Sequence, residues 1–246
     1  MDKMLFTAMS GLKQLLRSQA DNAHNLANVA TIGFKAELQH FVHKDVQGAG
    51  FPTRSFSVME KTGINFAEGS HSHTGRDLDV AIKGKGFLAV QSASGDEAYS
   101  RAGSLQINAN GLLSTSSGEL VLGNGGPVSI PPSSKIQIGG DGTISVIPTG
   151  QQSNSIAVID RIKLVKPDET QMQKGKDGLF YMNDGSTADA AADVNIVSGY
   201  LEGSNVNVID AMVSMIELSR NYELQSKMMK SAKENDSTST KLLTLS

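Results

Sequence analysis

The uneven distribution of glycine and proline is the sequence feature that most constrains the fold. Of 25 glycines, only Gly11 and Gly33 lie within residues 1–35, and none follows Gly203. All six prolines lie within residues 52–167. Because both residue types weaken the interior of a helix, the sequence predicts two helical ends and a turn-rich centre.

The first end has the apolar period of an amphipathic helix. Apolar residues recur at steps of three and four over residues 3–29, which places them on one face. The last end repeats such a stripe from Val208 to at least Lys233, with near-heptad spacing. Asn207 can cap this second helix, and Asp210 can satisfy a second free amide at its start.

The centre has the pattern of β-structure. Short apolar segments alternate with turn signals, which are Ser94-Gly95, Asn110-Gly111, Asp141-Gly142 and Asp184-Gly185. Short strands with closely spaced turns favour an antiparallel sandwich or a barrel-like domain. Residues 36–78 show neither period clearly, so we expect an extended connector there.

Each end helix has an apolar stripe that must be buried. The β centre has apolar alternation for its own core, so the simplest solution is that the helices pair and that their remaining apolar surface meets neighbouring subunits. The predicted fold class is α+β, with the long N- and C-terminal helices paired in a coiled-coil-like inner domain and a central, mainly antiparallel β domain. The predicted bounds are 1–35 with 205–246 for the helical inner domain, 36–78 for the connector and 79–204 for the β outer domain.

Composition excludes several classes of site. The chain has no cysteine, which excludes disulfides, thiolate metal sites and cysteine nucleophiles. A net charge of -3 gives no sign of a nucleic-acid partner. Residues 1–16 lack the continuous apolar core of a secretory signal, so we expect any export to use another route.

The sequence contains no complete metal-ligand set and no complete phosphate-binding motif. The pairs His40/His43 and His71/His73 have no further ligand nearby, so we interpret these histidines as solvated loop residues. The run 84–86, Gly-Lys-Gly, lacks the phosphate-loop pattern and predicts a tight turn between strands. We therefore predict no catalytic residue, no metal, no cofactor and no small-molecule substrate.

Three stretches resemble signatures of the flagellar rod and hook protein family. They lie at residues 25–35, at residues 79–87 and at residues 199–208 with the helix that follows, and their order and spacing agree with the family. The motif residues are Thr31, Gly33, Phe34, Lys35, Asp79, Gly84, Gly86, Phe87, Ser204, Asn205 and Asn207.

The resemblance implies a structural subunit of the flagellar basal-body rod and not an enzyme. Such proteins combine a helical inner domain made from both termini with a β outer domain. They are exported unfolded through the flagellar type III export apparatus, without a cleaved signal peptide, and polymerise helically into the rod that crosses the periplasm and transmits torque to the hook. The implied partners are other flagellar rod proteins and copies of the same chain. The residues that we assign to subunit assembly are Leu5, Met9, Leu12, Leu16, Asn25, Leu26, Asn28, Val208, Met212, Met215, Leu218, Tyr222 and Met229.

Within the family, the run 74–76 and the run 121–127 resemble the proximal rod subunits most. Distal rod subunits share all three signatures and are the alternative. Hook proteins are disfavoured, because 246 residues leave no room for their additional outer domain. The alternative from another class is a β-domain binding module or enzyme with helical dimerisation ends, which the missing catalytic constellation weakens.

Overall fold

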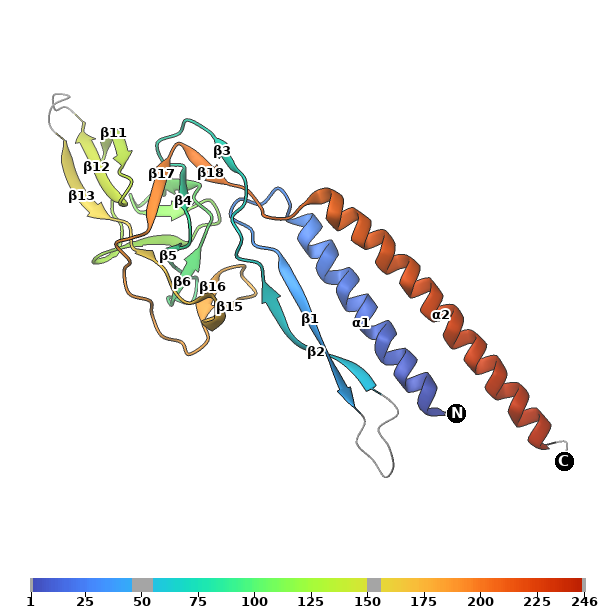
Figure 1. Ribbon diagram of the computed structural model, residues 1–246. Coiled ribbons are helices and arrows are strands. Elements are labelled where there is room, and N and C mark those ends of the chain that lie inside the picture. Colours follow the sequence, from blue (N-terminus) through green and yellow to red (C-terminus); the bar gives the residue numbers. More distant parts are fainter. Residues whose placement is uncertain (1, 46–54, 150–155, 245–246) are drawn as a thin grey trace. The chain divides into compact units, whose positions relative to one another are not determined.

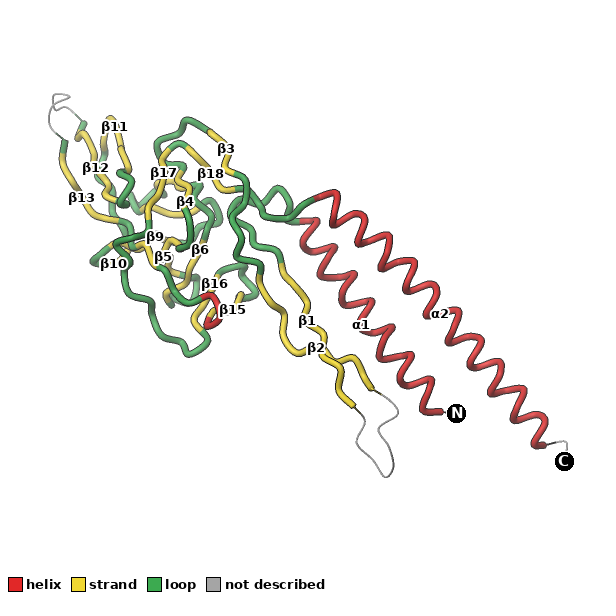
Figure 2. Tube along the Cα trace, in the orientation of Figure 1, coloured by secondary structure: helices red, strands yellow, loops and turns green. Residues whose placement is uncertain are grey.

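The chain folds into two compact units. The computed structural model describes residues 2–45, 55–149 and 156–244. We call residues 1–29, 36–65 and 206–246 the helix–hairpin unit, and residues 30–35 and 66–205 the β unit. Figure 1 labels the elements of both units, and Figure 2 separates helices from strands and loops.

The helix–hairpin unit contains two long helices, α1 (Asp2–Ala27) and α2 (Val208–Thr244), and a hairpin of β1 (Glu37–Asp45) and β2 (Ser55–Ile64). The helices lie side by side and run in opposite directions, with the hairpin along α1 (Figure 1). None of the described helical residues forms a segment long and apolar enough to cross a membrane.

Polar side chains hold α1 to both of its neighbours. Asn22 donates from Nδ2 to the Ala211 carbonyl of α2 at 2.7 Å. On the hairpin side, Gln14 donates from Nε2 to the Ser57 carbonyl at 2.9 Å. The amide of Gln225, on α2, lies 3.0 Å from the position that a Cβ at Gly11 would occupy, so this glycine permits a close approach of the two helices.

The predicted cap of α2 is confirmed. The Asn207 side chain accepts a hydrogen bond from the Ile209 amide at 3.0 Å, and its carbonyl accepts from the Ala211 amide at 3.0 Å. Asn207 thereby satisfies one of the free amides at the start of the helix, while Asp210 places a negative charge in the first turn.

The predicted coiled-coil-like pairing of the terminal helices is wrong. Met9, Leu16, Val208 and Met212 of the predicted stripes are exposed, which does not fit knobs packed into a continuous seam. Of the apolar side chains described on the two helices, only Leu12 and Ala211 are buried. The sequence pattern misled because α1 packs on a β-hairpin as well as on α2.

The segment 36–78 is not one uniform connector. Its first half is the β1–β2 hairpin, whose strands pair antiparallel from Glu37 opposite Ile64 to Asp45 opposite Ser55. Its second half belongs to the β unit and contains β3 (His71–His73). In β1 the apolar residues Phe41 and Val42 are neighbours in the sequence, which interrupts the alternation by which half-buried strands are recognised.

The β unit is built from short antiparallel strands. Its largest sheet has the order β15-β16-β6-β5-β9-β8-β7, with β10 on β9 and β14 on β5. The strands β11-β12-β13 form a second sheet, and β17-β4 and β18-β3 are paired separately. The bounds are β4 Val80–Lys83, β5 Phe87–Gln91, β6 Glu97–Ser100, β7 Leu105–Ile107, β8 Leu113–Thr115, β9 Leu120–Gly123, β10 Gly126–Pro127, β11 Ser133–Ile138, β12 Thr143–Pro148, β13 Ala157–Arg161, β14 Leu164–Val165, β15 Met172–Lys174, β16 Phe180–Met182, β17 Asn195–Ser198 and β18 Tyr200–Glu202, with a 3-10 turn at Glu169–Gln171.

Aliphatic side chains from many of these strands form one core. Leu88, Leu105, Leu113, Val121 and Ile144 are each fully buried in it. The β unit therefore has its own hydrophobic core, as the alternation of its short apolar segments predicts.

Candidate functional site

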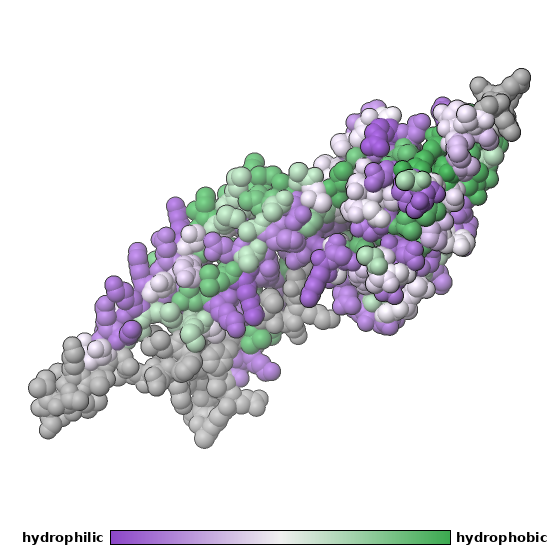
Figure 3. Space-filling view, turned by 180° about the vertical axis from the view of Figure 1, so that it is seen from behind, coloured by the Kyte–Doolittle hydropathy of each residue, from purple (hydrophilic) through white to green (hydrophobic). Residues whose placement is uncertain are grey.

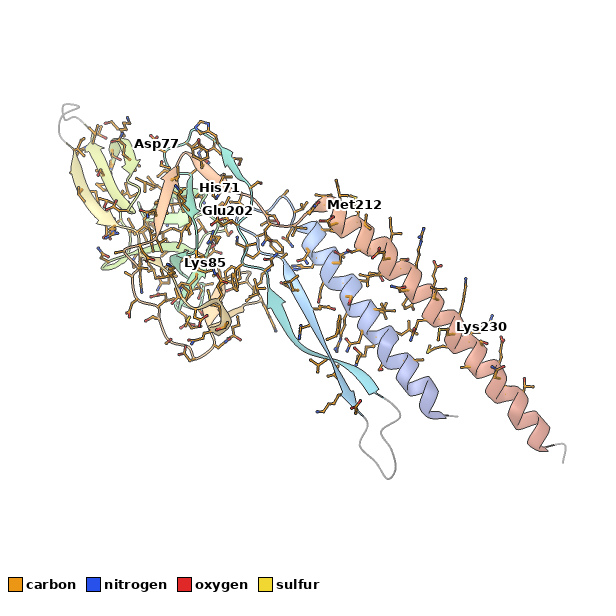
Figure 4. The ribbon with its side chains drawn as sticks, in the orientation of Figure 1. His71, Asp77, Lys85, Glu202, Met212 and Lys230 are labelled. Carbon is orange, nitrogen blue, oxygen red and sulfur yellow. The ribbon has the colours of Figure 1, made fainter. Side chains whose placement is uncertain are left out.

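The parts of the three signature stretches that belong to the β unit meet around the carboxylate of Glu202. This residue ends β18, and its side chain is completely buried (Figure 4). Lys35 Nζ lies 2.6 Å from Glu202 Oε1, and Arg101 Nη1 lies 2.8 Å from Oε2. Both cationic side chains are also buried. The result is a network of two positive charges and one negative charge within the folded β unit.

Backbone groups complete the network. The Gly69 amide donates to Glu202 Oε1 at 3.0 Å. Lys35 also donates to the Ala67 carbonyl at 2.7 Å, and Arg101 Nη2 donates to the Gly84 carbonyl at 2.6 Å. The network therefore joins five stretches of chain that are far apart in the sequence.

Burial and hydrogen bonding act in opposite directions on the two titratable partners. Burial disfavours the charged carboxylate of Glu202, but hydrogen bonds from Gly69, Lys35 and Arg101 outweigh it and hold the pKa of Glu202 below its usual value. Burial lowers the pKa of Lys35, and the nearby carboxylate of Glu202 offsets this only in part. The carboxylate accepts three donors, whereas the ammonium reaches one carboxylate and one carbonyl, so the carboxylate is the better compensated partner.

Gly33 brings the first signature stretch against this network. Its amide donates to the Glu202 carbonyl at 2.8 Å. Its φ is +69°, and a Cβ at this position would lie 2.3 Å from the Arg101 carbonyl carbon. Only glycine combines that backbone conformation with so close an approach.

The central signature supplies an aromatic layer beside the network. The Arg101 guanidinium lies 5.4 Å from the centre of the Phe87 ring. Phe87 in turn packs against Phe66 and Phe180 at ring distances of 5.8 and 5.5 Å. Gly86 makes room for this arrangement, because a Cβ there would lie 2.7 Å from a Val194 methyl group.

The remaining motif residues act mainly through the backbone. The Phe34 carbonyl accepts from the Asn205 amide at 3.3 Å, and Asn205 Nδ2 donates to the Ala67 carbonyl at 3.0 Å. The Asp79 carbonyl accepts from the Gly199 amide at 2.7 Å, and Asp79 itself is buried. Thr31 is exposed and Ser204 is half-buried. Gly84 forms the predicted turn between β4 and β5, with a φ of +79°.

The residues assigned to subunit assembly lie on the two helices, except Asn28 just after α1, and they do not form one surface. Leu12 is buried, and Asn25 fixes the start of β1 by exchanging two hydrogen bonds of 2.9 Å with the Glu37 backbone. Asn28 donates to the His24 carbonyl, one turn earlier in the chain. Met9, Leu16, Val208, Met212 and Tyr222 are exposed, whereas Leu26, Met215, Leu218 and Met229 are half-buried. The side chain of Leu5 lies outside the described residues.

The predicted site residues do not include Arg101 or Glu202. Glu202 falls within the third signature stretch, between Leu201 and Gly203. Glu202 is a charged residue at the end of a strand, within a stretch that resembles a family signature. This combination is the signal that could have indicated a buried partner. No comparable signal marks Arg101, because its partners are distant in the sequence.

The fold and this site define a structural class. A β unit is closed around its own core, and its charged cluster has hydrogen-bonded partners within the same unit, while apolar side chains remain exposed on the helices. Such an arrangement is typical of a subunit that is packed against others.

Comparison with known proteins gives the family. Residues 81–146 match the family described as "Flagellar hook protein FlgE/F/G D1 domain", and residues 197–242 match "Flagellar basal body rod FlgEFG protein C-terminal". The flagellar basal-body rod protein FlgF of Escherichia coli strain K12 is 39% identical, with all of both chains covered. FlgF of Buchnera aphidicola subsp. Schizaphis graminum is 32% identical over 96% of this chain and 95% of its own. A rod protein named FlgG from the same Buchnera is 33% identical over 83% of this chain and 86% of its own.

The chain therefore belongs to the flagellar basal-body rod protein family, and it is a structural subunit of the rod. The resemblance of the three signature stretches to that family is confirmed.

Proposed function

We propose that this subunit occupies the proximal part of the rod and polymerises helically, with copies of itself and with other rod proteins, into the shaft that transmits torque from motor to hook. The resemblance of the runs 74–76 and 121–127 to proximal rod subunits supports the proximal position, and the full-length similarity to flagellar basal-body rod proteins supports the place in the rod. The exposed apolar residues of α1 and α2 support a role for the helix–hairpin unit in assembly.

The β unit has a different part in this proposal. Its core and its Lys35–Glu202–Arg101 network stabilise it internally, so it folds around its own contacts and forms the outer domain. The chain works without catalysis, cofactor or small-molecule ligand. It reaches the periplasmic part of the rod through the flagellar type III export apparatus, without a cleaved signal peptide.

The single observation that carries the assembly role is the exposure of Met9, Leu16, Val208 and Met212, because a soluble monomer gains nothing from apolar side chains in water. The test is purification of basal bodies from cells that make a tagged form of the chain, with a tagged cytoplasmic enzyme as control. We expect the chain, and not the control, to remain with basal bodies after detergent and salt washes. A chain recovered only in the soluble fraction of motile cells would contradict the proposed function.

A further inference from the structure

The helix α2 has two apolar faces, and only one of them meets α1. Ala211 is buried on the α1 side, where its carbonyl accepts from Asn22. Ile209, Val213 and Ile216 lie roughly 180° away around the helix, given about 100° of rotation per residue. Their side chains are 72%, 50% and 54% exposed. We call these three residues the α2 row.

The β1–β2 hairpin also has an exposed apolar face. Gln39 points toward α1, where it bonds Ser18 and Asp21. Because side chains alternate between the faces of a strand, Leu38 and Val42 point away from α1. Val58 lies directly opposite Val42 across the hairpin, on the same face. All three of these aliphatic side chains are exposed, and we call them the hairpin face.

The charges beside these two surfaces are complementary. Asp210 and Glu217 flank the α2 row, and Arg220 lies beyond its end, one turn after Ile216. Lys44 lies on the hairpin face by the same alternation that places Val42 there, and His40 lies between Leu38 and Val42 on that face. Opposite charges beside two apolar surfaces favour one mutual orientation over others.

The two surfaces do not meet within one chain. Helix α1 lies between α2 and the β1–β2 hairpin (Figure 1), so two surfaces that both face away from α1 lie on opposite sides of the unit. Hydrophobic residues reach the surface of this unit among hydrophilic ones in the space-filling view (Figure 3). A contact between the two surfaces therefore needs two copies of the chain.

We propose that the α2 row of one copy docks on the hairpin face of a second copy. This inference rests on the proposed function and specifies its contact between like subunits. The contact joins two different surfaces, so each added copy leaves one free α2 row and one free hairpin face. Head-to-tail contacts of this kind build rings or open helical assemblies, whereas a contact between identical surfaces stops at a dimer.

Engineered cysteines test the pairing directly, because the natural chain has none. The variants are Val213→Cys in the α2 row and Val58→Cys on the hairpin face, both at exposed positions. Under mild oxidation, a mixture of the two variants should give a disulfide-linked dimer, while each variant alone should give little. A chain that carries both substitutions should give a ladder of linked oligomers. The control mixture combines Val213→Cys with Ser117→Cys, whose cysteine lies at an exposed turn of the β unit and outside the proposed contact.

A charge reversal tests the orientation of the same contact. Lys44→Glu, added to the Val58→Cys chain, should lower the yield of linked dimer several-fold. In the proposed contact, the new glutamate would face Asp210 and Glu217 of the other copy, and like charges repel. Glu217→Lys, added to the Val213→Cys chain, should restore the yield. Both effects should weaken at high salt.

Two results would overturn the inference. The first is a matched mixture that links no better than the Ser117→Cys control. The second is efficient linking of Val213→Cys with itself, which would indicate a symmetric contact between α2 helices. If the chain still purifies with basal bodies, the rod function stands and only this contact is wrong. Absence from basal bodies would instead contradict the function.

Discussion

The Nζ of Lys35 lies 2.6 Å from Oε1 of Glu202, although the two residues are 167 positions apart in the sequence. Lys35 belongs to the first segment of the β unit and Glu202 to its last strand. Because both side chains are buried, neither charge is compensated until both segments are in place. The β unit is therefore complete only when the chain is present as far as β18.

Removing the charge of Glu202 should destabilise the β unit strongly. Glu202→Gln keeps the size of the side chain but leaves Lys35 and Arg101 buried without a negative partner. Breaking a buried pair in this way costs about 3–5 kcal/mol. Urea unfolding followed by circular dichroism should show this loss in the free energy of unfolding.

A surface pair provides the matched control. Asp193 lies 2.5 Å from Lys166, and both side chains are about half-exposed. Asp193→Asn should change the free energy of unfolding much less than Glu202→Gln does, because water screens exposed pairs. Equal losses for the two variants would show that the network around Glu202 contributes no more than a surface contact.

Acid should destabilise the β unit through the same carboxylate. Burial opposes ionisation of Glu202, but its three hydrogen-bond donors hold its pKa below the usual 4.5. A carboxyl whose pKa is lower in the folded state stabilises the fold above its unfolded pKa, and this contribution is lost as pH falls through the folded pKa. The urea midpoint of the natural chain should therefore fall as pH drops below the usual value of 4.5.

The variant Glu202→Gln isolates this contribution from that of the surface carboxylates, which titrate in both proteins. Its urea midpoint should be lower at neutral pH but should decline less steeply in acid. Parallel pH profiles for the two proteins would mean that Glu202 does not carry the acid sensitivity.

Local signals in the sequence predicted much of this fold. Asn207 caps the first turn of α2 through a contact with Ile209, two residues later. The segment after Gly203 has no glycine, and α2 begins at Val208, as these two signals predict. The glycines of the predicted turns, among them Gly111 and Gly142, have positive φ values of +78° and +86°.

The parts that could not be predicted depend on contacts between distant residues. In β1 the adjacent apolar residues Phe41 and Val42 interrupt the alternation of a strand. The packing of the hairpin along α1 depends on contacts such as that of Gln14 with Ser57. The pairing of Arg101 with Glu202 spans 101 positions. No spacing rule connects residues so far apart, because only the folded sheet brings them together.

Gly33 should be intolerant of a side chain for two separate reasons. An alanine would be strained by the φ of +69°, and its Cβ would lie 2.3 Å from the Arg101 carbonyl carbon. Gly185 has nearly the same φ, +71°, but open space where the Cβ would lie. Gly185→Ala should cost about 1–2 kcal/mol from backbone strain alone.

The difference between the two variants measures the clash. Gly33→Ala should lower the thermal midpoint of the β unit clearly more than Gly185→Ala. Similar midpoints would show that the segment 30–35 can move away from Arg101 without cost, and would remove Gly33 from the residues that hold the signature stretches together.

Two substitutions on the helices should separate folding from assembly. Leu12 is buried within the helix–hairpin unit, whereas Met212 is 51% exposed. Leu12→Asp would place an unpaired carboxylate among apolar side chains, which is costly, so it should unfold the helix–hairpin unit while the thermal transition of the β unit stays nearly unchanged. It should also abolish incorporation into the rod and motility.

Met212→Asp should leave the isolated chain folded, because its carboxylate is solvated there. In the rod, the proposed assembly buries this part of α2, so the same carboxylate would lose its water and incorporation should fall sharply. Asn221→Asp adds the same charge at an exposed polar position of α2 and serves as the control. Circular dichroism of the purified chains, immunoblots of basal bodies and swimming in soft agar measure the three effects. Normal swimming with Met212→Asp would show that the exposed apolar surface around Met212 is not buried in the rod, and a loss of helix in the isolated variant would show that the residue already matters to the monomer.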